Sequence, residues 1–164
     1  GANANAVKEL VIASIFLSMR QLCEAWSYVR GLTAADDHAL EEAVRWTAPV
    51  QHVMRTAREN VVLDGRQIAA GDWLMLCYLS GNRDEQAFDS PDHFRIGHDR
   101  GRNVAFGHGA HICLGQHLAR LEMQVFFEEL LRRLTFIELS GTPRRLASIF
   151  IGGPRTLPVR FSVL

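Results

Sequence analysis

A turn rich in glycine and histidine, which ends in a cysteine and leads directly into a long helical pattern, constrains this chain more than any other feature. The turn covers residues 106–115 and reads Phe-Gly-His-Gly-Ala-His-Ile-Cys-Leu-Gly. A cysteine at the start of a helix lies near unpaired backbone N–H groups and the positive end of the helix dipole, and both favour thiolate over thiol. We therefore expect Cys113 to serve as a soft anionic metal ligand.

The glycines of this turn predict that it is shaped around a bound group. Gly107 and Gly109 permit backbone conformations that other residues avoid, and with Gly115 they omit side chains where a flat molecule could approach the main chain. Two alternatives are a buried, inert cysteine and a zinc site, since imidazole and thiolate both bind zinc. The spacing differs from the paired-ligand patterns of structural zinc sites. The zinc site would use His108, His111, Cys113 and His117.

The sequence continues after Gly115 with Gln-His-Leu-Ala-Arg, which ends at Arg120. The whole segment 106–120 resembles the cysteine loop of the cytochromes P450, the haem-thiolate monooxygenases, in its bacterial form. The resemblance implies that the cofactor is haem b, iron protoporphyrin IX, and that Cys113 is the axial ligand of its iron. Thiolate ligation favours O–O cleavage in that chemistry.

The same resemblance implies further cofactor contacts. Phe106 is expected to pack against the proximal face near the cysteine, where an aromatic ring limits water, and the main chain at Gly107 and Gly115 is expected to lie close to the cofactor. Haem carries two propionates that need cations or hydrogen-bond donors. Arg55 and His111 match the family's propionate contacts.

A Glu-x-x-Arg motif lies upstream of the cysteine. Glu42 and Arg45 are three residues apart on one helical face and can pair there; taken alone, such pairs are mostly surface ion pairs of small value. The resemblance implies a buried pair that fixes the following irregular segment, the meander, beneath the haem. The meander's usual third basic member falls in Ser90-Pro91-Asp92-His93-Phe94, where the sequence offers His93. Asn82-Arg83-Asp84 is expected to close a turn.

Residues 1–6 resemble the middle of the family's distal helix, which crosses the oxygen pocket and normally carries an acid followed by an alcohol. Ala4 and Asn5 stand in these positions, so we expect distal proton delivery either to be altered or to use water and Asn5, as a catalytic residue. The chain begins at Gly1, and the resemblance covers only the C-terminal part of a family member. We therefore expect residues 1–164 to form a single domain, the C-terminal fragment of a larger cytochrome P450 domain.

Apolar periodicity predicts a mainly α fold with small antiparallel β-sheets, as in the C-terminal part of the P450 fold. Asp64-Gly65 is a strong hairpin signal. The helix after the cysteine carries two adjoining apolar lines, which predicts burial on more than one side. Helices are expected at 7–19, 21–29, 33–48 and 114–134, strands at 52–55, 61–63, 67–69 and 73–79, the meander at 80–102, and short strands within 136–164.

Composition excludes several classes of protein. Eighteen basic and 18 acidic residues give a net charge of zero, which argues against a nucleic-acid partner. The longest apolar run, residues 10–17, is too short to span a bilayer, so no membrane partner is expected. Three widely spaced cysteines, an odd number, favour a reducing compartment and therefore the cytoplasm.

The leading hypothesis is the haem-binding portion of a monooxygenase that inserts one oxygen atom from O2 into a small organic substrate. The resemblance implies a ferredoxin-type electron donor with an NAD(P)H-dependent reductase. An acidic partner of this kind could dock on a basic patch made of Arg102, His108, His117 and Arg120. The alternatives are a truncated or inactive haem-thiolate module without monooxygenase activity, and the zinc-binding protein.

Overall fold

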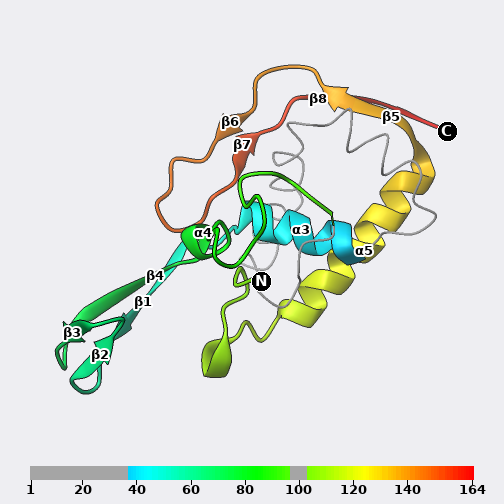
Figure 1. Cartoon of the computed structure of the whole chain (residues 1–164). Helices are drawn as coiled ribbons and strands as arrows, with labels where there is room; N and C mark the ends of the chain where they lie inside the picture. The colour runs from blue at the N-terminus through cyan, green and yellow to red at the C-terminus, as the bar shows by residue number, and fades with distance from the viewer. Residues whose placement is uncertain (1–36, 97–102) are drawn as a thin grey trace.

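The computed structural model describes residues 37–96 and 103–164. Asn5 and the helices predicted at 7–19 and 21–29 lie outside these ranges. In the described part, the two longest helices are α3 (Asp37–Thr47) and α5 (Gln116–Arg133), which pack against each other near the middle of the molecule (Figure 1). Short sheets extend from this pair of helices in opposite directions.

The strands of the described residues pair in antiparallel sheets of two strands each. The pairs are β1 (His52–Thr56) with β4 (Trp73–Cys77), β2 (Val61–Leu63) with β3 (Arg66–Ile68), β5 (Leu134–Leu139) with β8 (Val159–Val163), and β6 (Arg144–Arg145) with β7 (Pro154–Thr156). The predicted combination of helices with small antiparallel sheets is confirmed for these residues. Within 37–96 and 103–164, no helix is both long and apolar enough to cross a membrane.

The turn between β2 and β3 follows directly from its sequence. Asp64 has φ +49° and Gly65 has φ +73°. A two-residue turn with positive φ at both positions matches the right-handed twist of the strands it joins, and Asp-Gly is a preferred pair for it. The predicted hairpin is confirmed, and together with β1 and β4 it forms an arm that extends away from the helices (Figure 1).

The last strand of this arm is shorter than predicted. β4 ends at Cys77, and the next residues form the short helix α4 (Tyr78–Gly81) instead of continuing to residue 79. The Tyr78 N–H still donates to the carbonyl of Gln51, at 2.9 Å, while the Tyr78 carbonyl accepts the N–H of Asn82, also at 2.9 Å. This second bond turns the chain back toward α3.

The end of α3 is set by a proline. Pro49 has no N–H and disfavours helical conformation in the residue before it. Ala48, the residue before it, lies outside the helix with φ +33°, in a region that non-glycine residues seldom occupy, and it is fully buried. Its N–H still donates to the carbonyl of Val44, at 2.9 Å, so the last turn of the helix remains hydrogen-bonded.

A small apolar core lies where α3 meets α5 and the segment before the cysteine. Partly buried aromatic and aliphatic side chains extend it toward the cysteine loop and the meander. The buried members are Leu40, Ala43, Val44, Ala48, Ala105 and Met123, with Leu79, Phe94, Phe106 and Phe127 packed against them.

The expectation that both apolar lines of α5 are buried is wrong for this structure. Met123 is 3% exposed, whereas Leu114, just before the helix, is 98% exposed and Leu118 is 60% exposed. Leu121 and Val125 continue the exposed line. The helix therefore packs on α3 through one face only, and an apolar stripe that begins next to the cysteine is open.

This asymmetry predicts different costs for truncating the two lines. Met123→Ala removes a buried side chain and should lower the free energy of unfolding by about 2–5 kcal/mol. Leu118→Ala, the matched control on the same helix, should change it by less than about 0.5 kcal/mol. Equilibrium denaturation in urea, followed by circular dichroism, measures both values. Equal losses in the two variants would contradict the packing described.

Candidate functional site

The segment that contains the cysteine is a compact turn closed by backbone hydrogen bonds. The N–H of Cys113 donates to the carbonyl of Phe106 at 2.8 Å, and the N–H of Gly107 donates to the carbonyl of Val104 at 2.8 Å. Between them lies a 3₁₀ turn, η3 (Gly109–His111). We call residues 103–115 the cysteine loop.

Two of the three glycines of the loop are required by its shape. Gly107 has φ +77° and Gly109 has φ +69°, a region that favours glycine. A Cβ on Gly107 would in addition lie 3.2 Å from the hydroxyl oxygen of Tyr78. Gly115 has the ordinary φ of −85°, and a Cβ there would lie 3.9 Å from the sulfur of Cys113, an ordinary contact distance. The backbone conformation at position 115 therefore does not require glycine.

Cys113 presents an exposed thiol that forms no disulfide. It lies two residues before Gly115, which caps the N-terminus of α5, and its carbonyl accepts the N–H of Gln116 at 3.2 Å. Ile112 and Leu114, on either side of it, expose their apolar side chains. The cysteine is therefore accessible at a helix start, within an apolar surface.

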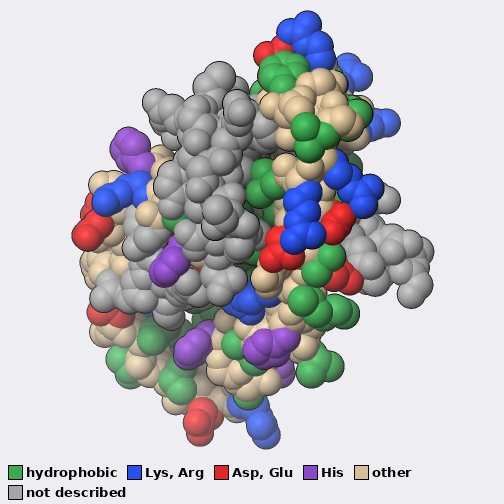
Figure 2. All heavy atoms as spheres, turned by 90° about the vertical axis from the view of Figure 1, so that its right-hand side faces the viewer, with side chains coloured by type: hydrophobic (Ala, Val, Ile, Leu, Met, Phe, Trp, Pro, Cys, Tyr) green, Lys and Arg blue, Asp and Glu red, His purple; other side chains and the backbone are tan. Residues whose placement is uncertain are grey.

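The space-filling view onto α5 shows the character of this surface. Histidine and apolar side chains gather in the lower part of the view, and charged side chains of both signs are prominent above them (Figure 2). His108, His111 and His117 are all exposed. Among the described residues, however, no three His, Cys, Asp or Glu side chains are grouped so that they could hold a metal ion. The zinc site predicted as an alternative needs such a group, so the structure does not support it.

A buried ion pair within α3 also binds the irregular segment that precedes the cysteine loop. Nε of Arg45 donates to Oε2 of Glu42 at 2.6 Å, and Nη2 donates to Oε1 at 2.7 Å. Both residues are buried, Arg45 with 1% exposure. The backbone N–H of Arg95 adds a third donor to the carboxylate, at 2.7 Å. A buried pair is stable only when such additional bonds satisfy its remaining donors and acceptors.

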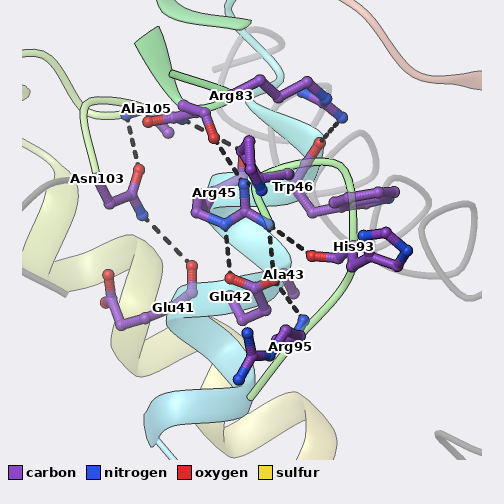
Figure 3. A network of polar contacts seen from close by, with 12 residues as sticks. Glu41, Glu42, Ala43, Arg45, Trp46, Arg83, His93, Arg95, Asn103 and Ala105 are labelled. Carbon is purple, nitrogen blue, oxygen red and sulfur yellow. Dashed lines mark hydrogen bonds and ion pairs between the residues drawn. The ribbon is translucent and has the colours of Figure 1, made fainter. Parts of the chain in front are cut away.

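The remaining donors of Arg45 gather backbone carbonyls from the meander. Nη1 donates to the carbonyl of Asn82 at 2.6 Å and to that of Pro91 at 3.0 Å, and Nη2 donates to the carbonyl of His93 at 3.1 Å. His93 thus takes part through its main chain, and its imidazole points away from Arg45 (Figure 3). This differs from the expected role of His93 as a basic side chain, because its carbonyl already takes the place beside the guanidinium.

Asn82 does more than close a turn, the role expected of it, because its side chain links two segments of the chain. Its side chain is fully buried. The amide Nδ2 donates to the carbonyl of Arg45 at 3.3 Å, and Oδ1 accepts the N–H of Val104 at 2.8 Å. Asn82 therefore joins α3 to the start of the cysteine loop. In the sequence, the one signal for this role is that the Asn82 side chain carries both a hydrogen-bond donor and an acceptor.

Arg83 forms an outer layer on the same network. Its guanidinium carbon lies 4.8 Å from the ring centroid of Trp46, and Nη2 donates to the Trp46 carbonyl at 3.0 Å. Burial and the nearby cation of Arg45 lower the pKa of Arg83. The Trp46 ring also lies near the other guanidinium group, since the guanidinium carbon of Arg45 is 5.6 Å from its centroid.

The two predicted propionate contacts lie on different elements. Arg55 is in β1, half-buried, opposite Leu74 of β4, and its Nη1 donates to the neighbouring carbonyl of Met54 at 2.9 Å. His111 is exposed at the end of η3. Asn5 lies outside the described residues.

The predicted basic patch carries less uncompensated positive charge than its residue types indicate. Arg120 forms an ion pair with Glu41 of α3, so its charge is compensated within the molecule. Arg102 lies outside the described residues, and His108 and His117 remain exposed.

The buried pair predicts a large penalty for removing one partner. Arg45→Met leaves Glu42 as an uncompensated buried charge and should lower the free energy of unfolding by about 3–5 kcal/mol. The matched control is Arg133→Met, which removes an exposed partner of Glu129 and should cost less than about 1 kcal/mol. Urea denaturation of both variants gives the comparison; similar costs would show that the buried pair is not structurally important.

Comparison with known proteins identifies this arrangement. The family model described as "Cytochrome P450" matches residues 37–154. The chain is 54% identical over 123 residues to cytochrome P450-terp from Pseudomonas sp., a match covering 75% of this chain and 29% of the relative. It is 43% identical over 127 residues to a steroid C26-monooxygenase from Mycolicibacterium smegmatis, covering 76% of this chain and 31% of the relative.

Solved structures agree with the sequence matches. CYP108D1 from Novosphingobium aromaticivorans superposes with a TM-score of 0.86 at 42% identity, covering 96% of this chain and 38% of that protein. A thermophilic cytochrome P450 from Sulfolobus tokodaii gives a TM-score of 0.86 at 30% identity, covering 96% and 42%. The chain thus spans less than half the length of the relatives it matches. The cysteine loop, the buried ion pair and these matches together show that the chain belongs to the cytochrome P450 family.

Proposed function

We propose that this chain carries the proximal, thiolate-donating part of a cytochrome P450 monooxygenase site, with Cys113 as the axial ligand of haem b. The observation that carries the proposal is the position of Cys113. Its thiol is exposed and forms no disulfide, and it lies at the start of α5 on a turn fixed by two positive-φ glycines. A cysteine sulfur is one of the axial ligands that hold haem iron in proteins.

The residues around the sulfur suit a haem in polarity. Ile112 and Leu114, on either side of Cys113, and Leu118 on the first turns of α5 expose apolar side chains, which suits the mainly apolar porphyrin. Gly109 has nothing within 4 Å of the position of a Cβ, and a Cβ on Gly115 would meet only the cysteine sulfur, at 3.9 Å, so no other part of the chain fills these two positions. When bound, haem supplies the redox-active iron at which O2 is activated for insertion of one oxygen atom into an organic substrate.

The chain's own residues position the cofactor and exclude water. Cys113 supplies the sulfur ligand, and its position is fixed by the hydrogen bond from its N–H to the carbonyl of Phe106. The ring of Phe106 limits water on the proximal side, while Gly107 and Gly115 allow the main chain close to the cofactor. Arg55 and His111 offer a cation and a donor for the two propionates. Asn5 remains our proposal for distal proton delivery.

Substrate, electron donor and compartment belong to the same proposal. We infer a small, apolar organic substrate, because relatives carry names such as steroid C26-monooxygenase and linalool 8-monooxygenase. Electrons would come from a ferredoxin-type protein with an NAD(P)H-dependent reductase, and the enzyme would act in the cytoplasm. The 164 residues would form a single domain, the C-terminal portion of a larger P450 domain.

The ligand assignment is tested by a reduced carbon monoxide spectrum. The full chain, expressed with a supply of haem and then reduced, should give a Soret band well to the red of a histidine-ligated haem. Cys113→Ala should abolish this band. Cys77→Ala, which removes the other exposed cysteine of the described residues, should leave it unchanged. A histidine-type band, or a red-shifted band that survives in Cys113→Ala, would disprove the assignment.

A further inference from the structure

A cation lies over the aromatic ring of the cysteine loop. The guanidinium carbon of Arg120, on α5, is 4.6 Å from the ring centroid of Phe106. This is within the distance, about 6 Å, at which a guanidinium attracts the face of an aromatic ring. The contact links the helix that follows the cysteine to the residue that begins its turn.

Arg120 is itself held in place from two sides. Its Nε and Nη2 donate to the carboxylate of Glu41, with Nη2 at 3.3 Å from Oε2. Nη1 donates to the side-chain oxygen of Gln116 at 2.8 Å, one turn back on α5. The Glu41 side chain is only 12% exposed, so this pair is shielded from solvent more than the other Arg–Glu pairs of α5. The plane of the guanidinium is therefore fixed relative to the ring.

The ring in turn is coupled to the cysteine through the backbone. The carbonyl of Phe106 accepts the N–H of Cys113 at 2.8 Å, so a shift of Phe106 moves or breaks that bond. Glu41 also anchors the start of the loop, because its own carbonyl accepts Nδ2 of Asn103 at 3.3 Å (Figure 3). A continuous series of contacts thus runs from α3 through Arg120 and Phe106 to the cysteine.

Glu41 and Glu42 are adjacent but serve separate networks. Glu42 binds Arg45 and the meander, whereas Glu41 binds Arg120 on α5. Successive residues of a helix point in directions about 100° apart, which sends the two carboxylates to different neighbours. One turn of α3 therefore supports the cysteine loop from two sides.

We propose that Arg120, held by Glu41, is a positioning residue that fixes Phe106 and, through it, the Cys113 turn. Its meaning for haem ligation rests on the proposed function, but its effect on the loop does not require haem. Loss of the guanidinium frees the ring and allows the bond between Cys113 and Phe106 to open more often, while the rest of the fold is unaffected.

Amide hydrogen exchange of the full chain without haem tests this directly. Arg120→Gln and Glu41→Gln should each accelerate exchange of the Cys113 amide by about threefold to tenfold, because exchange reports local opening. Arg120→Lys, which retains a cation beside Glu41 and the ring, should restore part of the protection. Amides of β5 and β8 serve as the internal reference, and Arg133→Gln, which breaks the exposed pair with Glu129, serves as the matched control. The exchange rates of the β5 and β8 amides in Arg120→Gln and Glu41→Gln, and that of the Cys113 amide in Arg133→Gln, should remain within about twofold of wild type.

A double-mutant cycle identifies the ring as the link. In a Phe106→Leu background, Glu41→Gln should no longer change exchange of the Cys113 amide, since the contact that transmits its effect is already gone. Equal acceleration by Glu41→Gln in both backgrounds would overturn the proposal. So would wild-type exchange of Cys113 in Arg120→Gln, or acceleration of every amide to the same degree.

The two proposals fail separately. If the carbon monoxide spectrum is of the histidine type while Arg120→Gln still releases the Cys113 amide, Arg120 positions the loop and only the haem assignment is wrong. If wild-type protein gives the thiolate spectrum while exchange in Arg120→Gln is unchanged, the haem assignment stands and the positioning role is wrong.

Discussion

The buried ion pair between Glu42 and Arg45 is the interaction on which the rest of the site depends. A guanidinium has five N–H donors in a fixed plane, and burying it requires that each finds an acceptor. Here the carboxylate of Glu42 and the carbonyls of Asn82, Pro91 and His93 accept them. An irregular segment without a regular backbone ladder is thereby held against α3.

Asn82 extends this order to the cysteine. Because its side chain bonds both to the backbone of Arg45 and to the N–H of Val104, the beginning of the cysteine loop is placed relative to α3. The second carboxylate of α3, Glu41, holds Arg120 over the ring of Phe106 in the same loop. A short helix thus determines where the thiol lies, although it contributes no residue to the turn itself. The exposed apolar stripe on α5 leaves the surface next to the thiol accessible.

Local sequence signals predicted much of this structure. Asp64-Gly65 specified its turn because both residues tolerate positive φ, and Pro49 specified the end of α3 because it cannot continue a helix. The glycines of the cysteine loop were informative for the same reason, and Gly107 and Gly109 do adopt the conformation that glycine favours. Family membership followed from the spacing of that loop, as the matches to known proteins confirm.

Features that depend on long-range contacts were not predictable from the sequence. The use of the His93 carbonyl in place of its side chain, the linking role of Asn82, and the pairing of Arg120 with Glu41 all join residues distant along the chain. The apolar pattern of α5 likewise could not indicate which of its lines packs inside this chain. The central claim is that the sulfur of Cys113 bonds directly to haem iron. X-ray absorption at the iron edge of the haem-loaded chain tests it: we predict a sulfur neighbour that disappears in Cys113→Ala, whereas iron with only nitrogen and oxygen neighbours in the wild type would contradict the account.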